Sequence, residues 1–281
     1  MESPPRKTVD PAVLGTEFEP YEIDFTERDT IVYALGVGAG RDDRELPYVW
    51  EEGLVALPTA PVVAVSRIFI EMTDVLGISG RARVHGEQRY VLHRTPPTAG
   101  RVRVEARVTG VWDKGEGAVI DTTAELSVDG EPLATATFAS FVRGGGGFGG
   151  ERGAGLRVAR PEGPPDHVLT DAMSWNQALL YRLTGDLNPL HIDPVFAAES
   201  GFSRPIAHGL CTYGYAVRMA MAGLGVGPEE VAEANCRFVA PVYPGDALRL
   251  ELWNPVEGRA FARLTTPDAT AIEPLELILR H

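Results

Sequence analysis

An internal repeat is the feature that most restricts how this chain can fold. Residues 25–35 align with residues 173–183 at an offset of 148, and both segments have helix-type apolar spacing that ends in Tyr-x-Leu. In each segment a hydroxyl residue, Thr26 or Ser174, is placed to cap the N-terminus of a short helix. Both halves later contain a Pro-x-x-x-Gly turn followed by the alternating apolar pattern of a strand. The chain is therefore expected to fold as two similar units.

A glycine-rich segment lies between the two halves. Six of the seven residues in 144–150 are glycine, and three prolines follow before residue 166. Backbone of this composition does not sustain the interior of a helix or strand, so it predicts a connector. It is not a phosphate-binding loop, since no Gly-Lys-Ser/Thr follows it. We expect a first unit at 1–143, a linker at 144–167 and a second unit at 168–281.

The second half contains the clearest helix pattern. A long apolar run predicts a helix from His208 to about Leu224, and its apolar residues lie on nearly every side, which indicates a buried helix. A smaller helix is expected at 194–200, with Asp193 as its cap and Gly201 as its stop. Each half should have a short helix, a loop, a longer apolar helix and several antiparallel strands. This order predicts an α+β fold in which each curled antiparallel sheet wraps around a long helix.

Composition narrows the class of protein. The 281 residues are 44% hydrophobic and 23% charged, which is ordinary for a globular chain, and the formal net charge of −13 argues against a general nucleic-acid binder. No apolar run approaches the roughly 18 residues of a membrane-spanning helix, and residues 1–7 lack the apolar core of a signal peptide. The chain ends without a Ser-Lys-Leu type address. With Cys211 and Cys236 as the only cysteines, we expect a cytoplasmic protein without disulfides.

The candidate chemistry lies in the run Tyr181-Arg-Leu-Thr-Gly-Asp-Leu-Asn-Pro-Leu-His191. It places Asp186, Asn188 and His191 within six residues, around a Gly-Asp turn and an Asn-Pro pair. A carboxylate and an imidazole held this close can both contact one water molecule. The alternative interpretation is structural: the C-terminus of a helix followed by a polar turn.

Further along, the chain continues as Arg204-Pro-Ile-Ala-His-Gly-Leu-Cys-Thr-Tyr-Gly214. Together the two runs resemble the signature of the hydratase 2 family, which are MaoC-like, R-specific enoyl-CoA hydratases. The first half is similar to the substrate-binding half of the two-repeat members through Tyr33–Gly38, Val84–Gln88, Asp113–Gly117 and Phe141–Gly150. The resemblance covers almost the entire chain. It implies a double hot-dog fold, a homodimer, and reversible hydration of trans-2-enoyl-CoA to (3R)-3-hydroxyacyl-CoA without a cofactor or metal.

The resemblance also assigns roles to residues. Asp186 and His191 match the acid/base pair, and Gly209 matches the glycine whose backbone N–H binds the thioester oxygen at the start of the long helix. Judged from its own chemistry, Asn188 can donate to the water or to Asp186 and so fix their orientation. The residues expected to contact the acyl-CoA are His85, Gly86, Lys114, Asp186, Leu187, Asn188, Pro189, Leu190, His191, Gly209 and Phe238. Taken alone, Lys114 in its Asp-Lys-Gly turn suits a solvated surface position, and Phe238 suits the core of a strand. For His208 we favour a structural role over a supporting role in the site. Candidates for a basic rim around the CoA are Arg143, Arg237 and Arg249.

Only one half carries this set. At the offset of 148, Gly38, Gly40 and Asp43 stand where Asp186, Asn188 and His191 stand in the second half. The two glycines imitate a dinucleotide fingerprint, but they follow a helical pattern, whereas that fingerprint follows a strand. We therefore expect a single active site, with room in the first half for a bulky or long acyl chain.

Other site types fit the sequence poorly. A metal site built from His191, Asp193 and His208 is disfavoured because Asp193 suits a helix cap, and the chain has no His-Glu-x-x-His and no cysteine cluster. No Gly-x-Ser-x-Gly elbow is present. The expected function is an enoyl-CoA hydratase that acts on acyl-CoA thioesters, with no nucleic-acid or membrane partner. The alternatives are a dehydratase acting on acyl-carrier-protein substrates, a hot-dog thioesterase and an acyl-CoA binding protein without activity.

Overall fold

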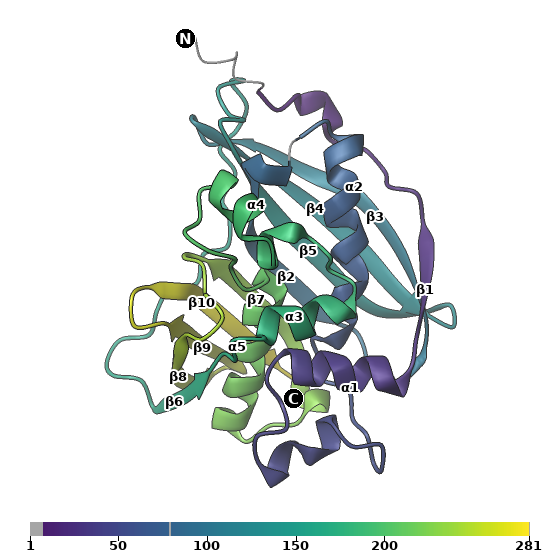
Figure 1. Cartoon of the computed structure of the whole chain (residues 1–281), viewed down its shortest axis with the longest axis vertical. Coiled ribbons are helices and arrows are strands. Elements are labelled where there is room, and N and C mark those ends of the chain that lie inside the picture. Colours follow the sequence, from purple (N-terminus) through teal and green to yellow (C-terminus); the bar gives the residue numbers. More distant parts are fainter. Residues whose placement is uncertain (1–7, 79, 281) are drawn as a thin grey trace.

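In the computed structural model, which describes residues 8–78 and 80–280, the described strands form one antiparallel sheet of ten strands (Figure 1). The first half supplies β1 (Tyr21–Phe25), β2 (Arg83–Leu92), β3 (Gly100–Asp113), β4 (Gly117–Val128) and β5 (Glu131–Arg143). The second half supplies β6 (His167–Ala172), β7 (Val231–Phe238), β8 (Ala247–Val256), β9 (Arg259–Thr265) and β10 (Thr270–Leu279). The helices are α1 (Glu27–Gly36), α2 (Ser66–Val75), α3 (Gln177–Tyr181), α4 (Pro194–Glu199) and α5 (Gly209–Leu224).

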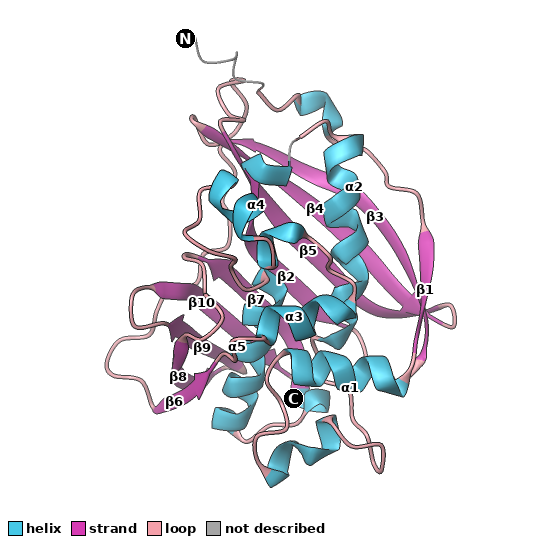
Figure 2. Ribbon diagram, in the orientation of Figure 1, coloured by secondary structure: helices cyan, strands magenta, loops and turns pink. Residues whose placement is uncertain are grey.

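The strand order confirms the repeat. Across the sheet the strands run β1-β3-β4-β5-β2-β7-β10-β9-β8-β6, so each half follows the same internal order: first, third, fourth, fifth, second. The halves meet where β2 pairs with β7, with Gln88 opposite Cys236. The helices lie against the concave side of the curved sheet (Figure 2). The two units are therefore joined through backbone hydrogen bonds into one continuous sheet.

The long helix of the second half is confirmed. α5 begins after His208 and ends before Gly225, whose left-handed backbone at φ 69° closes the helix. Every residue from Leu210 to Met221 is buried, as expected for a helix that is apolar on all sides. Among the described residues, no helix has the length and apolar character needed to cross a membrane.

The first-half counterpart is shorter than the repeat suggests. α2 has ten residues and is preceded by a 3₁₀ segment at Ala60–Val65. That segment contains Pro61 and three valines, and the restricted backbone of proline and the β-branched side chains of valine favour a regular α-helix weakly. The first half therefore has a shorter central helix than the second half.

Two of the three expected helix caps are confirmed. The Thr26 hydroxyl accepts a bond from the N–H of Asp29 at 3.3 Å, and the Asp29 carboxylate accepts one from the N–H of Thr26 at 2.9 Å. Asp193 caps α4 by accepting from the N–H of Val195 at 2.8 Å. The prediction for Ser174 was wrong, because its hydroxyl bonds the side chain of Asn176 at 2.6 Å and the helix starts only at Gln177.

The segment between β5 and β6 has no helix or strand, but it is anchored to the sheet. The carboxylate of Asp113 accepts bonds from the N–H groups of Gly147 at 2.9 Å and Gly149 at 2.7 Å. These backbone bonds lower the pKa of Asp113 to about 2. A side chain at Gly146 has no room, because a Cβ there would lie 2.2 Å from the carbonyl oxygen of Gly117. The predicted domain limits stay a prediction, and residues 1–7, for which no signal peptide was expected, lie outside the described residues.

Candidate active site

The loop that follows α3 carries the predicted acid and base. Gly185, with φ 120°, turns the chain out of the helix, and two short side-chain bonds then fix the loop. The Asp186 carboxylate accepts from the N–H of Asn188 at 3.2 Å, and the Asn188 side-chain oxygen accepts from the N–H of Leu190 at 3.1 Å. The backbone of Asn188 therefore holds Asp186, and its side chain starts the 3₁₀ turn Pro189–His191. The expected role of Asn188 in orienting a water stays a prediction.

His191 is held in one tautomer. Its Nδ1 lies 2.9 Å from the carbonyl oxygen of Ile206, and because a carbonyl oxygen only accepts, Nδ1 carries the proton and Nε2 keeps its lone pair. Burial lowers the pKa of His191, although the negative charge of Asp186 opposes this shift. The imidazole is therefore neutral near pH 7, with Nε2 able to accept a proton.

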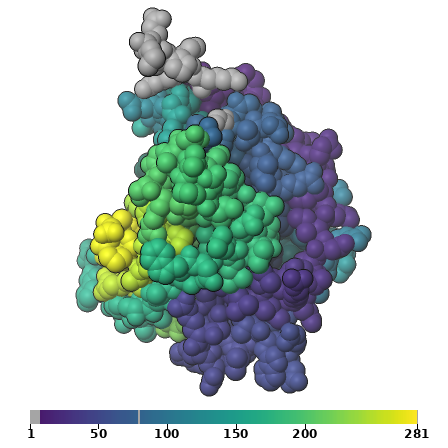
Figure 3. Space-filling view, in the orientation of Figure 1, coloured from purple at the N-terminus to yellow at the C-terminus, as the bar shows by residue number. Residues whose placement is uncertain are grey.

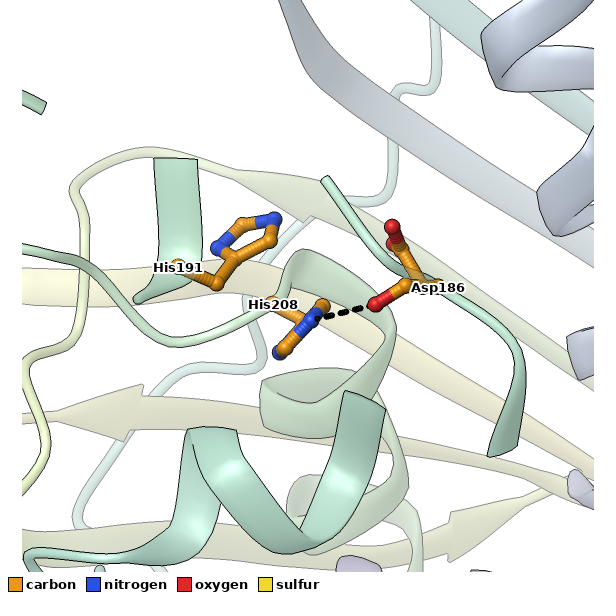
Figure 4. A group of neighbouring side chains, drawn as sticks. All are labelled: Asp186, His191 and His208. Carbon is orange, nitrogen blue, oxygen red and sulfur yellow. Dashed lines mark hydrogen bonds between the residues drawn. The ribbon is translucent and has the colours of Figure 1, made fainter. Parts of the chain in front are cut away.

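His208 packs directly against this pair (Figure 4). Its ring lies 3.7 Å from the ring of His191 between centroids, and its Nε2 donates to the backbone oxygen of Asp186 at 3.2 Å. Burial, with a further effect from His191, lowers the pKa of His208 well below its ordinary value. His208 therefore fixes the backbone that carries Asp186 and supports the ring of His191.

The same three residues form a potential ligand cluster for a metal ion. Single ligand atoms of Asp186, His191 and His208 all lie within 4.8 Å of one another. In each imidazole one nitrogen bonds a backbone carbonyl and the other is left to act as a ligand, but the two rings stack instead of spreading around a common point. Asp193, which the sequence offered as a third ligand, caps α4. This donor set suits proton transfer better than metal coordination.

Gly209 lies where two aromatic side chains meet. It is the first residue of α5, where backbone N–H groups lack partners within the helix and the dipole favours negative charge. A Cβ at Gly209 would lie 3.6 Å from both His85 and Phe238, whose rings are 4.7 Å apart. Burial lowers the pKa of His85 to about 3, so this ring is neutral as well. A thioester oxygen can thus approach the start of α5 between two uncharged rings.

These groups line one cavity of about 650 Å³, whose walls are formed by residues from both halves of the chain. All six residues from Asp186 to His191 line it, together with the other predicted residues Gly209, His85 and Phe238. The acid/base loop and the start of α5 come from the second half, whereas β2 and α2 of the first half close the opposite wall. Most of the residues that the sequence analysis expected to contact the acyl-CoA therefore line this cavity.

Gly86 and Lys114 are not among the residues that line this cavity. Gly86 follows His85 on β2, and a Cβ there would lie 3.3 Å from the carbonyl oxygen of Ala139. The Lys114 ammonium instead donates to the backbone oxygens of Arg152 and, at 3.3 Å, Gly153. Sequence position alone does not determine where a flexible ammonium group binds. The expected contacts of both residues with the substrate stay predictions.

Sequence reasoning missed Arg83 as a cavity residue and gave Arg143 only a general role at the rim. Both line the cavity. Arg83 precedes His85 by two residues on β2, so strand alternation places it on the same face. The alternation of side chains along β2 is the sequence signal that identifies Arg83 as a neighbour of His85.

A curved sheet wrapped around a central helix, duplicated and joined at β2 and β7, defines a double hot-dog protein. Its Asp/His pair beside a helix N-terminus is typical of the hydratases and dehydratases of that class. Residues 23–144 match the family model described as MFE-2 hydratase 2 N-terminal domain, and residues 157–267 match the MaoC like domain.

Similar proteins extend over nearly all of the chain. Enoyl-CoA hydratase ChsH3 of Mycobacterium tuberculosis is 38% identical over 287 residues, covering 94% of this chain and 96% of the relative. 3-hydroxyacyl-thioester dehydratase Y of the same organism is 40% identical and covers 94% of each. Peroxisomal multifunctional enzyme type 2 of Mus musculus is 39% identical over 85% of this chain, which spans 34% of that relative's length.

Solved structures of related proteins have the same fold. A MaoC-like dehydratase from Phytophthora capsici superposes with a TM-score of 0.83 at 25% identity, covering 98% of both chains. Full-length peroxisomal multifunctional enzyme type 2 from Drosophila melanogaster gives a TM-score of 0.79 at 31% identity, over 93% of this chain and 48% of that one. The chain belongs to the hydratase 2 family of MaoC-like proteins.

Proposed function

We propose that the protein is an (R)-specific enoyl-CoA hydratase, which reversibly hydrates trans-2-enoyl-CoA to (3R)-3-hydroxyacyl-CoA. One observation carries the proposal: the Asp186 carboxylate, the unprotonated Nε2 side of His191 and the N-terminus of α5 at Gly209 line the same cavity. The R configuration rests on membership of the hydratase 2 family.

The reaction needs a proton acceptor for water and a proton donor for the α-carbon. A water molecule held between Asp186 and His191 gives its hydroxyl group to C3 of the enoyl group and its proton to C2, with the side chains as relay. One O–H bond and the C2–C3 π bond break, while C3–O and C2–H bonds form. The Asp/His pair ends in its starting protonation state, so no cofactor is required for the balance.

The negative charge that develops on the thioester oxygen needs stabilisation. The free N–H groups at the start of α5 and the helix dipole provide it at Gly209. The neutral rings of His85 and Phe238 exclude water beside that oxygen, which strengthens the interaction. Removing one such donor in other enzymes lowers the rate by about 10²–10³-fold.

Two substitutions test the proposal. Asp186→Asn and His191→Ala should each lower the hydration rate of trans-2-enoyl-CoA by about 10²–10⁴-fold, because each removes one member of the proton relay. Melting temperatures should stay near the wild-type value. Asp193→Asn, which changes a nearby capping carboxylate outside the relay, and the exposed His93→Ala are matched controls. Wild-type turnover in both relay variants would refute the assignment.

The carrier of the acyl group separates this function from its main alternative. A dehydratase of carrier-protein substrates would act faster on acyl-carrier-protein thioesters than on the matching CoA thioesters. The names of several relatives, among them enoyl-CoA hydratase 2 of Arabidopsis thaliana, support the CoA ester. We expect faster turnover of the CoA thioester. A thiol-trapping assay covers the thioesterase alternative, since hydration releases no thiol.

The size of the acyl group is a further part of the proposal. The first half has a short α2 and supplies one wall of the 650 Å³ cavity, and these two features support a long or bulky acyl chain. Gly38 and Gly40 do not line this cavity. Turnover should hold or rise as the chain lengthens beyond C6. A sharp fall beyond C4–C6 would contradict this.

Assembly and location stay proposals as well. The segment that carries α3 and α4 covers the front of the molecule (Figure 3), and it exposes large apolar side chains, with Trp175 at 76% and Leu183 at 64%. Exposed apolar groups of this size are typical of interfaces, and they support a homodimer. Sedimentation equilibrium of the wild type and Trp175→Glu tests it, and a monomeric wild type would reject it. A cytoplasmic location is supported by the mycobacterial relatives, while other relatives are named peroxisomal.

A further inference from the structure

Arg83 is a cation in the cavity wall without a matching anion. Its Nη2 donates to the backbone oxygen of Phe69 in α2. Its Nη1 is buried and has no hydrogen-bond partner within residues 8–78 and 80–280, and no ion pair of Arg83 is found among those residues. Burial lowers the pKa of Arg83 to about 10, so the side chain is still charged near pH 7. A buried guanidinium donor without an acceptor is costly for the protein unless a ligand supplies the acceptor.

Another arginine in the interior, Arg218, does have carboxylate partners. Arg218 is buried, whereas Arg83 is half-buried with a buried Nη1, and Arg218 is paired with both Glu45 and Asp171. The protein has a formal net charge of −13, so carboxylates are abundant, yet none is paired with Arg83. Arg143 adds a second positive charge to the lining near the surface, where it donates to the backbone oxygen of Ser200 at 3.0 Å. Asp74 is the acidic residue on this part of the lining, and it is exposed.

The position of Arg83 defines which part of a substrate it can meet. His85 contacts the start of α5, where the thioester oxygen is bound in the proposed function. Arg83 lies two residues away on the same strand face, so its Cα is roughly 6.6 Å from that of His85. The first phosphate of CoA lies about 13 bonds from the thioester sulfur, roughly 16 Å in an extended arm at ~1.2 Å per bond. The group at Arg83 is therefore closer to the thioester than any phosphate of CoA.

We propose that Arg83 is a specificity residue that binds a carboxylate carried on the acyl group, so that the cavity takes enoyl thioesters with an acidic far end. The free Nη1 supplies the hydrogen bond, and Phe69 orients the guanidinium through Nη2. This inference rests on the proposed function for the placement of the thioester. It goes beyond that function by naming a class of acyl group.

Equilibrium binding tests the inference without turnover. Saturated acyl-CoA esters from C6 to C10, each with a methyl end or a carboxylate end, are titrated calorimetrically into the wild-type protein and Arg83→Met. The wild type should bind the carboxylate-ended ester about 10–100-fold more tightly than its methyl-ended partner at one or two chain lengths, as expected for a hydrogen bond to a charged group. Arg83→Met should lose this preference and bind methyl-ended esters within about threefold of the wild type.

Arg83→Lys keeps the positive charge and a hydrogen-bond donor, so it should retain part of the preference for the carboxylate-ended ester. It replaces Arg83→Met in the test if the methionine variant is unstable. Arg103→Met, a surface arginine on β3, is the control for lost net charge. Equal wild-type affinity for both ester types would overturn the proposal without any variant. A uniform loss for all esters in Arg83→Met would do the same, since it would indicate a pantetheine or structural contact. If the preference is present but enoyl-CoA is not hydrated, the proposed function fails while the carboxylate site stands.

Discussion

Gly209→Ala adds a single methyl group at the point where the thioester is expected to bind. The new Cβ would lie 3.6 Å from His85 Nδ1 and from Phe238 Cζ. These are ordinary van der Waals distances, so no neighbouring atom has to move. An unfolded chain with alanine at this position is less flexible than one with glycine. This difference stabilises the folded protein by about 0.4–1 kcal/mol where the folded backbone accepts alanine. The folded protein should therefore be as stable as the wild type or slightly more stable.

Activity should respond in the opposite direction. The methyl group fills the gap between the two rings and blocks the thioester oxygen from the N–H at the start of α5. If this oxygen loses its donor, the rate should fall by about 10²–10³-fold. At about 2–4 °C per kcal/mol for a chain of this size, the melting temperature should rise by no more than about 4 °C. Hydration of trans-2-enoyl-CoA and thermal unfolding are measured on the same preparation.

The other glycines of α5 serve as matched controls. A Cβ at Gly214 would lie 2.4 Å from a methyl group of Val37, and one at Gly223 would lie 2.7 Å from a methyl group of Leu252. Alanine at either position overpacks the core and should cost about 1–3 kcal/mol of stability. In Gly209→Ala the activity should therefore fall while the stability is kept. In the alanine variants of Gly214 and Gly223, activity and stability should fall together. Wild-type turnover in Gly209→Ala would refute the placement of the thioester at this residue.

Three further predictions concern buried ionisable groups. Arg218→Leu leaves the buried carboxylate of Glu45 without its cation and leaves Asp171 paired with Arg41 alone, and should lower the free energy of unfolding in urea by about 3–5 kcal/mol; a change below 1 kcal/mol would contradict this. Burial lowers the pKa of His191, so the acid limb of kcat/KM should fall below about pH 6.5, and a limb above that value would argue against His191 as the base. The unfolded state binds more protons at this residue, so its contribution to stability is present above pH 6.5 and declines as the pH falls below it. Burial raises the pKa of the Cys211 thiol, so a disulfide reagent at pH 8 should modify it only after unfolding.

The sequence predicted those parts of the fold that depend on local patterns. The apolar run before Gly225 marks α5 because burial on all sides leaves a signal along the whole helix. Asp193 marks the start of α4 because aspartate is a preferred N-cap residue and proline is favoured in the first turn of a helix. The run that carries the proposed acid/base pair was recognisable for the same reason: Asp186 and His191 lie on one short loop, and their proximity needs no long-range contact.

Features that depend on long-range contacts were not predictable. Ser174 has the spacing of a cap, but its hydroxyl bonds Asn176 instead, a choice between two nearby partners that spacing does not decide. Lys114 lies in a family-like motif, yet its ammonium reaches the linker some 38 residues away. Arg83 is identified only by what surrounds it, since its significance lies in a missing partner.

The structure also gives a physical reason why the first half holds no second site. Gly38, which stands opposite Asp186 in the repeat, has φ 79°, and a Cβ there would lie 2.4 Å from the ring of Tyr215 in α5. Any side chain at this position would combine backbone strain with a clash against a buried aromatic ring. Glu45, a little further along, pairs with Arg218 of the same helix. In the second half the corresponding loop is free to face the cavity, whereas in the first half it supports α5. Because α5 carries Gly209, the first-half loop serves the proposed reaction by holding in place the helix on which that residue lies.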